Sequence, residues 1–287
     1  MKDRPIPSPA VVVGVDGSHR AVDAALWAVE EAISRDIPLR LLYAIEPRPS
    51  LSAEQAARDL ANAEIAVRQV FMAVESLELP IKVEVEIVQD RPEHALINAS
   101  RAATMLVLGA LGVNHATGHR YGSVAAALSH TAHCPVAIVR RAATMSADSG
   151  WIVAEVNTRT TDSRVLESAL AEALLRNAPL RVLTTTDMPH DDSHDGGRAA
   201  ELARMTSAKL EKDLSYWRRR YPELDIDIVT APGLSLNYVA QHSESIQLVV
   251  VDQRDSHALG SAAGPAAHAV LRDSNCSVLI CERRNAL

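Results

Sequence analysis

The sequence predicts an α/β fold in which two tandem copies of a parallel sheet are each covered by helices. Continuous apolar segments alternate with amphipathic ones along the chain, an order that is typical of parallel sheets wrapped by helices. Hydrophobic residues make up 47% of the 287-residue chain while aromatic residues make up 3%, which suits small aliphatic side chains packed between helix and sheet. The third observation is that this pattern occurs twice.

The repeat is visible in the amino-acid sequence itself. The segment PLRLLYAIEP from Pro38 reappears as PLRVLTTTDMP from Pro179, and HCPVAIVRR from His133 reappears as NCSVLICERR from Asn275. Between the copies lies a polar segment of small residues without periodicity, at 140–150. We therefore predict one domain at 1–141 and a second at 150–287.

The first elements of the first copy follow from its apolar pattern. Residues 10–16 form a continuous apolar strand, and Ser18 is placed to cap the helix that follows it. This helix is predicted over 21–35. One side of it carries four apolar residues: Ala25, Leu26, Val29 and Ile33.

The next elements carry a second capping signal and an edge strand. A buried strand is predicted over 39–45, and Ser52 with Gln55 resembles a capping box that begins a helix ending near Glu78. In IKVEVEIV, from Ile81, apolar residues alternate with Lys and Glu, which indicates a strand with one face in water at a sheet edge.

The first copy closes with two more helices and two buried strands. Helices are predicted over 92–103 and 123–132, and strands over 105–109 and 135–139. The second copy repeats the scheme, including the alternating segment IDIV from Ile226.

Composition excludes several classes of function. A net charge of −7 without a basic face argues against a nucleic-acid or membrane-surface protein. No apolar run is long enough to span a membrane, and the first residues lack the apolar core of a signal peptide, so we expect a cytoplasmic protein. The three cysteines (Cys134, Cys276 and Cys281) are widely spaced beside apolar strands and are expected to be buried thiols, and no metal site is predicted.

Two predicted strands end in residues that suit a ligand site. The first ends in Asp16, and the fourth ends in Gly109, followed by Gly112 and then by the pair Gly122 and Ser123. Ligands of open parallel sheets bind beyond the carboxyl ends of the strands, where the strand order reverses. Glycines let backbone amides approach phosphate oxygens, and a helix that begins at Ser123 would offer free N–H groups to an anion.

On these residues the chain resembles the universal stress protein family, in particular its ATP-binding branch and the tandem-domain members of actinobacteria. The branch's signature, Gly-x2-Gly-x9-Gly-Ser/Thr, is met in full by Gly109, Gly112, Gly122 and Ser123, and the family's first-strand aspartate matches Asp16. The resemblance implies an adenine nucleotide α-hydrolase-like fold with strand order 3-2-1-4-5, so that strands 1 and 4 are neighbours.

The resemblance also implies a role for each matched position. Asp16 would contact the ribose or the adenine, and Val15 would pack near the base. The backbone of Ala44 would meet the adenine edge. The phosphates of ATP, accompanied by Mg²⁺, would lie on Gly109, Gly112, Gly122, Ser123 and the amide of Val124.

The second copy departs from this pattern. The positions of Asp16 and Gly109 are taken by Asn157 and Val251, and those of Gly112 and Ser123 are taken by Arg254 and Pro265. Bulky side chains and a proline without an N–H group are incompatible with the same phosphate cradle. We therefore expect only the first copy to bind nucleotide.

Binding is better supported than catalysis, because the sequence has neither a P-loop lysine nor a nucleophile elbow. The leading hypothesis is an ATP-dependent stress regulator without enzymatic activity, whose nucleotide-bound surface is recognised by an unknown protein partner. The alternatives are slow ATP hydrolysis or autophosphorylation at Ser123, cyclic AMP binding at the same site, and a pure interaction module. The last strand of each copy leaves a sheet edge, so we expect either a homodimer or an intramolecular pseudo-dimer.

Overall fold

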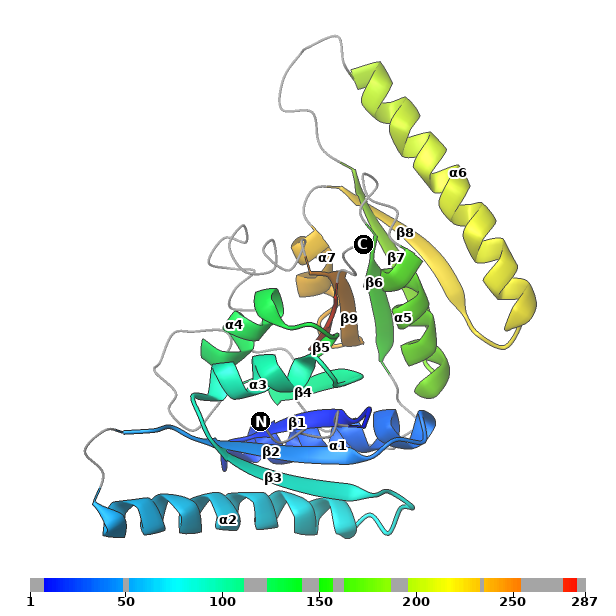
Figure 1. Cartoon of the computed structure of the whole chain (residues 1–287). Coiled ribbons are helices and arrows are strands. Elements are labelled where there is room, and N and C mark those ends of the chain that lie inside the picture. The colour runs from blue at the N-terminus through cyan, green and yellow to red at the C-terminus, as the bar shows by residue number, and fades with distance from the viewer. Residues whose placement is uncertain are drawn as a thin grey trace. The chain divides into compact units, whose positions relative to one another are not determined.

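The computed structural model describes residues 8–48, 52–110, 123–140, 150–156, 163–186, 196–232, 235–253 and 276–282 (Figure 1). The chain divides into two compact units. Unit 1 consists of residues 1–145 with 277–287, and unit 2 consists of residues 146–276. As the sequence predicts, strands and helices alternate along the chain.

Unit 1 begins with three strands and two long helices, which match the apolar pattern closely. The strands and helices of unit 1 are β1 (Val11–Val15), α1 (His19–Ser34), β2 (Leu39–Ile45), α2 (Ala53–Glu75), β3 (Val83–Gln89), α3 (Pro92–Ser100), β4 (Met105–Gly109), α4 (Ser123–Thr131), β5 (Val136–Val139) and β10 (Ser277–Cys281). The bounds of β2 and β4 are those predicted, and helix α2 ends three residues before the predicted Glu78, which has a φ of +53°.

The sheet of unit 1 confirms the predicted strand order. Its strands lie in the order β3-β2-β1-β4-β5, all parallel, so β3 is at the edge as its alternating sequence indicates. The strand β10, from the far end of the chain, pairs antiparallel with β5, with Leu279 opposite Ala137. The hydroxyl of Ser277 also accepts a hydrogen bond from the backbone N–H of Arg140, at 3.3 Å.

Helices cover both faces of this sheet. Successive residues of a strand point to opposite faces of the sheet, so Gly14 and Val15 face different layers of helices. A Cβ placed on Gly14 would lie 3.4 Å from Leu96 of α3. A Cβ on Gly109, which the strand register places beside Val15, would instead meet the backbone of Arg20 in α1. Helix α2 packs against α1, and α3 packs against α4, so each face carries a pair of helices.

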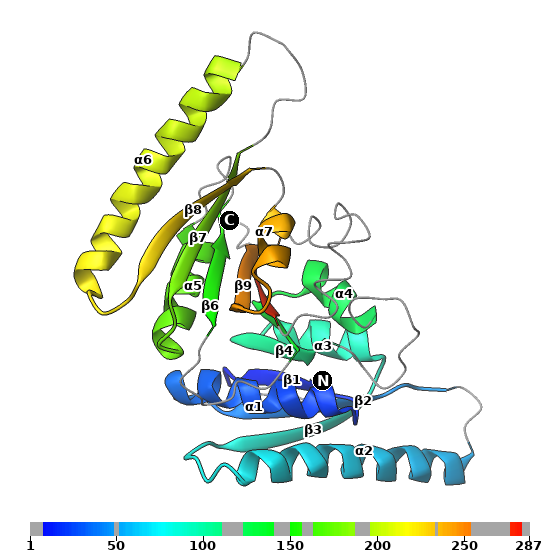
Figure 2. The same cartoon turned by 180° about the vertical axis from the view of Figure 1, so that it is seen from behind.

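Unit 2 repeats the scheme. Its elements are β6 (Trp151–Glu155), α5 (Ser163–Leu175), β7 (Leu180–Thr186), α6 (Gly196–Arg220), β8 (Ile226–Pro232), α7 (Ser235–Gln241) and β9 (Ile246–Asp252). The strands are parallel in the order β9-β6-β7-β8, which matches β4-β1-β2-β3 of unit 1. The long helix α6 lies alongside β8 in both views, as α2 lies alongside β3 (Figures 1 and 2). The predicted fold class is thus confirmed.

The inner face of α1 differs from the prediction at two positions, because Leu26 is only half-buried and Ile33 is exposed. Ile33 was assigned to the apolar side but is 37% exposed, whereas Glu31 is fully buried. The carboxylate of Glu31 forms an ion pair with Arg35, one turn later in the helix. The ion pair lets a charged residue lie on the buried side of the helix, four residues after the buried Trp27.

The same buried ion pair recurs in unit 2. Glu172 and Arg176 of α5 pair one turn apart, with side chains 2% and 4% exposed. A cross-strand pair is repeated as well, because Arg40 of β2 contacts Glu84 of β3 at 3.0 Å and Arg181 of β7 contacts Asp227 of β8 at 3.0 Å. The duplication therefore extends to charged contacts that support each sheet and its first helix.

Candidate functional site

Four of the residues predicted to bind nucleotide lie together at the carboxyl edge of the unit 1 sheet: Val15, Asp16, Ala44 and Gly109. Val15 is paired with Tyr43, so Asp16 and Ala44 directly follow paired residues of β1 and β2. On the other side of β1, the register with β4 extends to place Gly109 beside Val15. Because the three strands are parallel, these residues share one edge, at the point where the strand order reverses.

The turn from β1 to α1 is fixed by short polar side chains. The Oδ1 atom of Asp16 accepts a hydrogen bond from the backbone N–H of Ser18 at 2.9 Å, and the Ser18 hydroxyl accepts one from the N–H of Ala21 at 3.2 Å. Gly17, between them, has a φ of +84°, which a residue with a side chain rarely adopts. The turn presents the exposed Asp16 side chain at the sheet edge and caps α1 at the same time.

Gly109 has a packing role that the sequence does not reveal. A Cβ at this position would lie 2.7 Å from the carbonyl carbon, the carbonyl oxygen and the Cβ of Arg20. The first turn of α1 therefore approaches β4 as closely as a glycine permits. Arg20 also reaches the end of β5, because its guanidinium donates a hydrogen bond to the carbonyl oxygen of Arg140.

The remaining predicted residues are described only in part. Ser123 and Val124 begin α4, where their amides belong to the first turn of the helix. Gly112 and Gly122 lie outside the described residues. Of the second-copy positions, Val251 is in β9 and fully buried, whereas Asn157, Arg254 and Pro265 also lie outside the described residues.

A carboxylate that sequence reasoning missed lies close to this edge. Burial, together with the carboxylates of Asp16 and Asp59, raises the pKa of the Tyr43 hydroxyl. Asp59 belongs to α2, and its Oδ2 atom is 3.5 Å from Nη2 of Arg48. The signal that could have found it is its spacing, because Asp59 falls one turn before the buried stripe of α2 that begins at Ala63.

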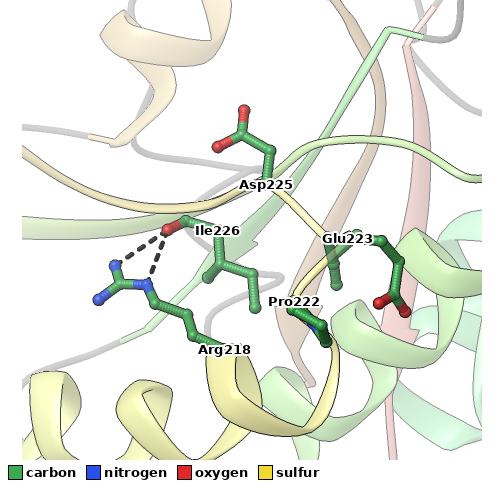
Figure 3. A pocket seen from close by; sticks show the side chains of 6 residues that line it. Arg218, Pro222, Glu223, Asp225 and Ile226 are labelled. Atoms are coloured by element: carbon green, nitrogen blue, oxygen red, sulfur yellow. Dashed lines mark hydrogen bonds between the residues drawn. The ribbon is translucent and has the colours of Figure 1, made fainter.

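A separate pocket of about 390 Å³ lies in unit 2, where α6 connects to β8 (Figure 3). It is lined by Arg218, Pro222, Glu223, Leu224, Asp225 and Ile226. The guanidinium of Arg218 donates hydrogen bonds to the carbonyl oxygen of Ile226 at 3.1 and 2.9 Å, and a third to Glu211 at 2.6 Å. Its donors are thus used to hold the helix against the strand, and the pocket is remote in sequence from the signature residues.

The three cysteines are buried, as the sequence predicts. Cys134, Cys276 and Cys281 are all buried free thiols. Burial is the main cause that raises the pKa of Cys134 to about 12, with Glu282 adding to it. None of the helices in the described part of the chain combines the length and apolar character needed to cross a bilayer.

Comparison with known proteins identifies the family. The model of the universal stress protein family matches residues 9–140 and 152–282. Universal stress protein Rv2028c of Mycobacterium tuberculosis strain H37Rv is 44% identical over 275 residues, which is 95% of each chain. Universal stress protein Rv2624c of the same strain is 36% identical over 274 residues, covering 95% of this chain and 96% of that one.

The solved structures agree on the fold. A universal stress protein from Archaeoglobus fulgidus DSM 4304 superimposes with a TM-score of 0.67 at 18% identity, covering 97% of both chains. The family match spans both halves of the sequence, and the two units described above carry the same element order. The chain therefore belongs to the universal stress protein family and carries its domain twice.

Proposed function

We propose that this protein is an ATP-binding stress-response regulator that takes one nucleotide, in its first domain. The observation that carries the proposal is the strand register, which aligns Asp16, Ala44 and Gly109 along one edge of the unit 1 sheet. The signature continues from there through Gly112 and Gly122 to Ser123. An acidic residue at one strand end and a glycine-rich segment leading into a helix at the next suit a nucleoside and its phosphates respectively.

Backbone amides supply most of the proposed phosphate contacts. The amides of Gly112, Gly122, Ser123 and Val124 would hold the phosphate oxygens, and the first turn of α4 would favour their negative charge. Mg²⁺ would accompany the triphosphate. Asp16 is held in place by the hydrogen bond from the Ser18 amide to Oδ1, and its exposed side chain would contact the ribose or the base.

Domain 2 is proposed to have lost this site. The sequence repeat matches Val251 to Gly109, whereas the strand register matches Asp252 to it, because Met105 lies beside Val11 and Leu248 lies beside Ile152. In either alignment a residue with a side chain stands where the first domain needs a glycine. Arg254 and Pro265 replace two further signature positions. With domains at 1–141 and 150–287, we propose a binding function for the first and a structural or partner-facing role for the second.

The proposal also covers the location of the protein and its partners. We propose a cytoplasmic location, and the net charge of −7 and the pI of about 5.9 favour protein partners over nucleic acids or membranes. The edge of β5 is paired with β10 of the same chain, which supports an intramolecular pseudo-dimer over a homodimer formed through that edge. We propose no enzymatic step, because none of the described side chains at the edge is arranged as a nucleophile with its base.

The test is calorimetric titration with ATP and Mg²⁺, alongside chromatography of nucleotide released from the denatured protein. We expect one ATP per chain in the wild type, and loss of binding in Gly122→Glu. Asp16→Asn can keep the oxygen that accepts from the Ser18 amide, while it removes the charge and replaces the other oxygen with an NH2 group, so its weaker binding would reflect the nucleotide contact. Absence of both heat and co-purified nucleotide would refute the proposal, as would two nucleotides per chain. Cyclic AMP that binds more tightly than ATP would point to the cyclic nucleotide instead.

A further inference from the structure

Asp59 occupies a position on α2 where an apolar residue is expected. The helix buries one stripe of small apolar side chains against the sheet and α1: Ala63, Ala66, Val67, Val70 and Val74. Asp59 lies four residues before Ala63 and seven before Ala66, so it extends this stripe toward the N-terminus of the helix. Its side chain is 23% exposed, and the exposed surface does not include Oδ2.

Within the described part of the chain, the buried Oδ2 atom of Asp59 has no hydrogen-bond partner. Nη2 of Arg48 lies 3.5 Å away, which is an ion-pair distance but too long for a strong hydrogen bond, and the Arg48 side chain is 64% exposed. A buried carboxylate oxygen without a donor is unfavourable, so such an atom in a native fold calls for an explanation.

Its surroundings place Asp59 at the nucleoside side of the proposed site. The Tyr43 hydroxyl, on β2, interacts electrostatically with both Asp16 and Asp59. Helix α2 also borders the β1–α1 turn, because a Cβ on Gly17 would lie 3.4 Å from the Cβ of Ala66. Strand β1 separates β2 from β4, so a group beside β2 is on the opposite side of the site from the phosphate-binding signature.

We propose that Asp59 accepts a hydrogen bond from the exocyclic amino group of the bound base and thereby selects adenine over 6-oxopurines. The inference rests on the nucleotide site proposed above. A carboxylate is only an acceptor at neutral pH, so it suits the 6-amino group of adenine, which is a donor. The 6-carbonyl of hypoxanthine or guanine is an acceptor, and it would leave the buried oxygen facing another oxygen.

The experiment compares ATP with inosine triphosphate, which has a carbonyl in place of the 6-amino group. We expect the wild type to bind ATP at least roughly tenfold more tightly than inosine triphosphate, as one charge-assisted hydrogen bond implies. In Asp59→Asn, which has nearly the same shape, the side-chain amide can donate to the 6-carbonyl. The preference for ATP is then expected to fall by roughly tenfold, mainly through tighter binding of inosine triphosphate.

Glu64→Gln is the matched control, because it removes the same charge from an exposed position of the same helix. It should leave the preference unchanged, and an unfolding curve for each variant checks that α2 is intact. If the wild type binds neither nucleotide, the proposed function itself fails. If ATP binds and Asp59→Asn keeps the wild-type preference, only the role of Asp59 fails. An effect confined to the Mg²⁺ dependence of affinity would also overturn it, because it would assign Asp59 to the cation.

Discussion

At Gly109, the requirement for a missing side chain comes from the helix that packs against the strand. An added Cβ would lie 2.7 Å from backbone atoms of Arg20, and a backbone cannot rotate away as a side chain can. The glycine is therefore needed for the fold of unit 1 whether or not a phosphate lies near it. A functional test based on this position would confuse lost binding with lost packing.

Gly109→Ala is accordingly expected to destabilise the protein by about 1–3 kcal/mol, the usual range for overpacking. Gly14→Ala is the natural comparison. Its Cβ would also lie 2.7 Å from a neighbour, but that neighbour is the terminal methyl group of Leu108, which can change rotamer. Urea unfolding of both variants measures the difference. Equal losses of stability would show that the α1 backbone is free to shift.

At the scale of single elements, the first helix of each unit contains a buried Glu–Arg pair. In α5, Glu172 and Arg176 are both almost fully buried. Removing one partner leaves the other charge buried without it, which costs more free energy than an intact pair contributes. Arg176→Met is therefore expected to lower the free energy of unfolding by about 3 kcal/mol.

An exposed pair of the same spacing provides the control. Glu54 and Arg58 of α2 are 75% and 71% exposed, so Arg58→Met is expected to change stability by less than about 1 kcal/mol. The double variant Glu172→Gln with Arg176→Met should recover part of the loss, because no buried charge then remains. Additive losses in this cycle would contradict an ion pair between the two side chains.

Elements with a local signal could be predicted from the sequence. The capping box of α2 forms as predicted, with the Ser52 hydroxyl accepting from the Gln55 N–H at 3.2 Å and Gln55 Oε1 accepting from the Ser52 N–H at 3.1 Å. The side of α1 that is buried could not be fully predicted. Glu31 is buried there together with a partner one turn away, and hydrophobicity alone does not reveal such a pair.

Only part of the candidate site could likewise be predicted from the sequence. Asp16, Ala44 and Gly109 follow from strand ends and glycine spacing, and the register of the strands places them together. Asp59 did not stand out, because a charged residue in an amphipathic helix is ordinarily assigned to the solvent face. Gly112 and Gly122 lie outside the described residues, so their predicted role in phosphate binding stays a prediction.

At the scale of the whole molecule, the last strand of the chain is part of the first unit. Strand β10 pairs with β5 and is grouped with residues 1–145, although the repeat assigns it to the second copy. This arrangement depends on pairing between distant segments, which neither periodicity nor turn signals report. It means that the unit with the proposed nucleotide site is completed only by the C-terminus.

A chain that ends at residue 275 is therefore expected to damage unit 1. It loses β10 and two of the three cysteines, so Cys134, beside the uncovered β5, is the only thiol left. In the intact protein this thiol is 4% exposed and its pKa is about 12, so it should react slowly with maleimide at pH 8. In the shortened chain we expect labelling at least roughly tenfold faster, as burial and the charge of Glu282 are both removed.

A chain that ends at residue 282 keeps β10 and should label like the intact protein, with the modified Cys134 peptide quantified by mass spectrometry in each case. Protection of Cys134 in the chain of 275 residues would show that β5 holds its place without its antiparallel partner.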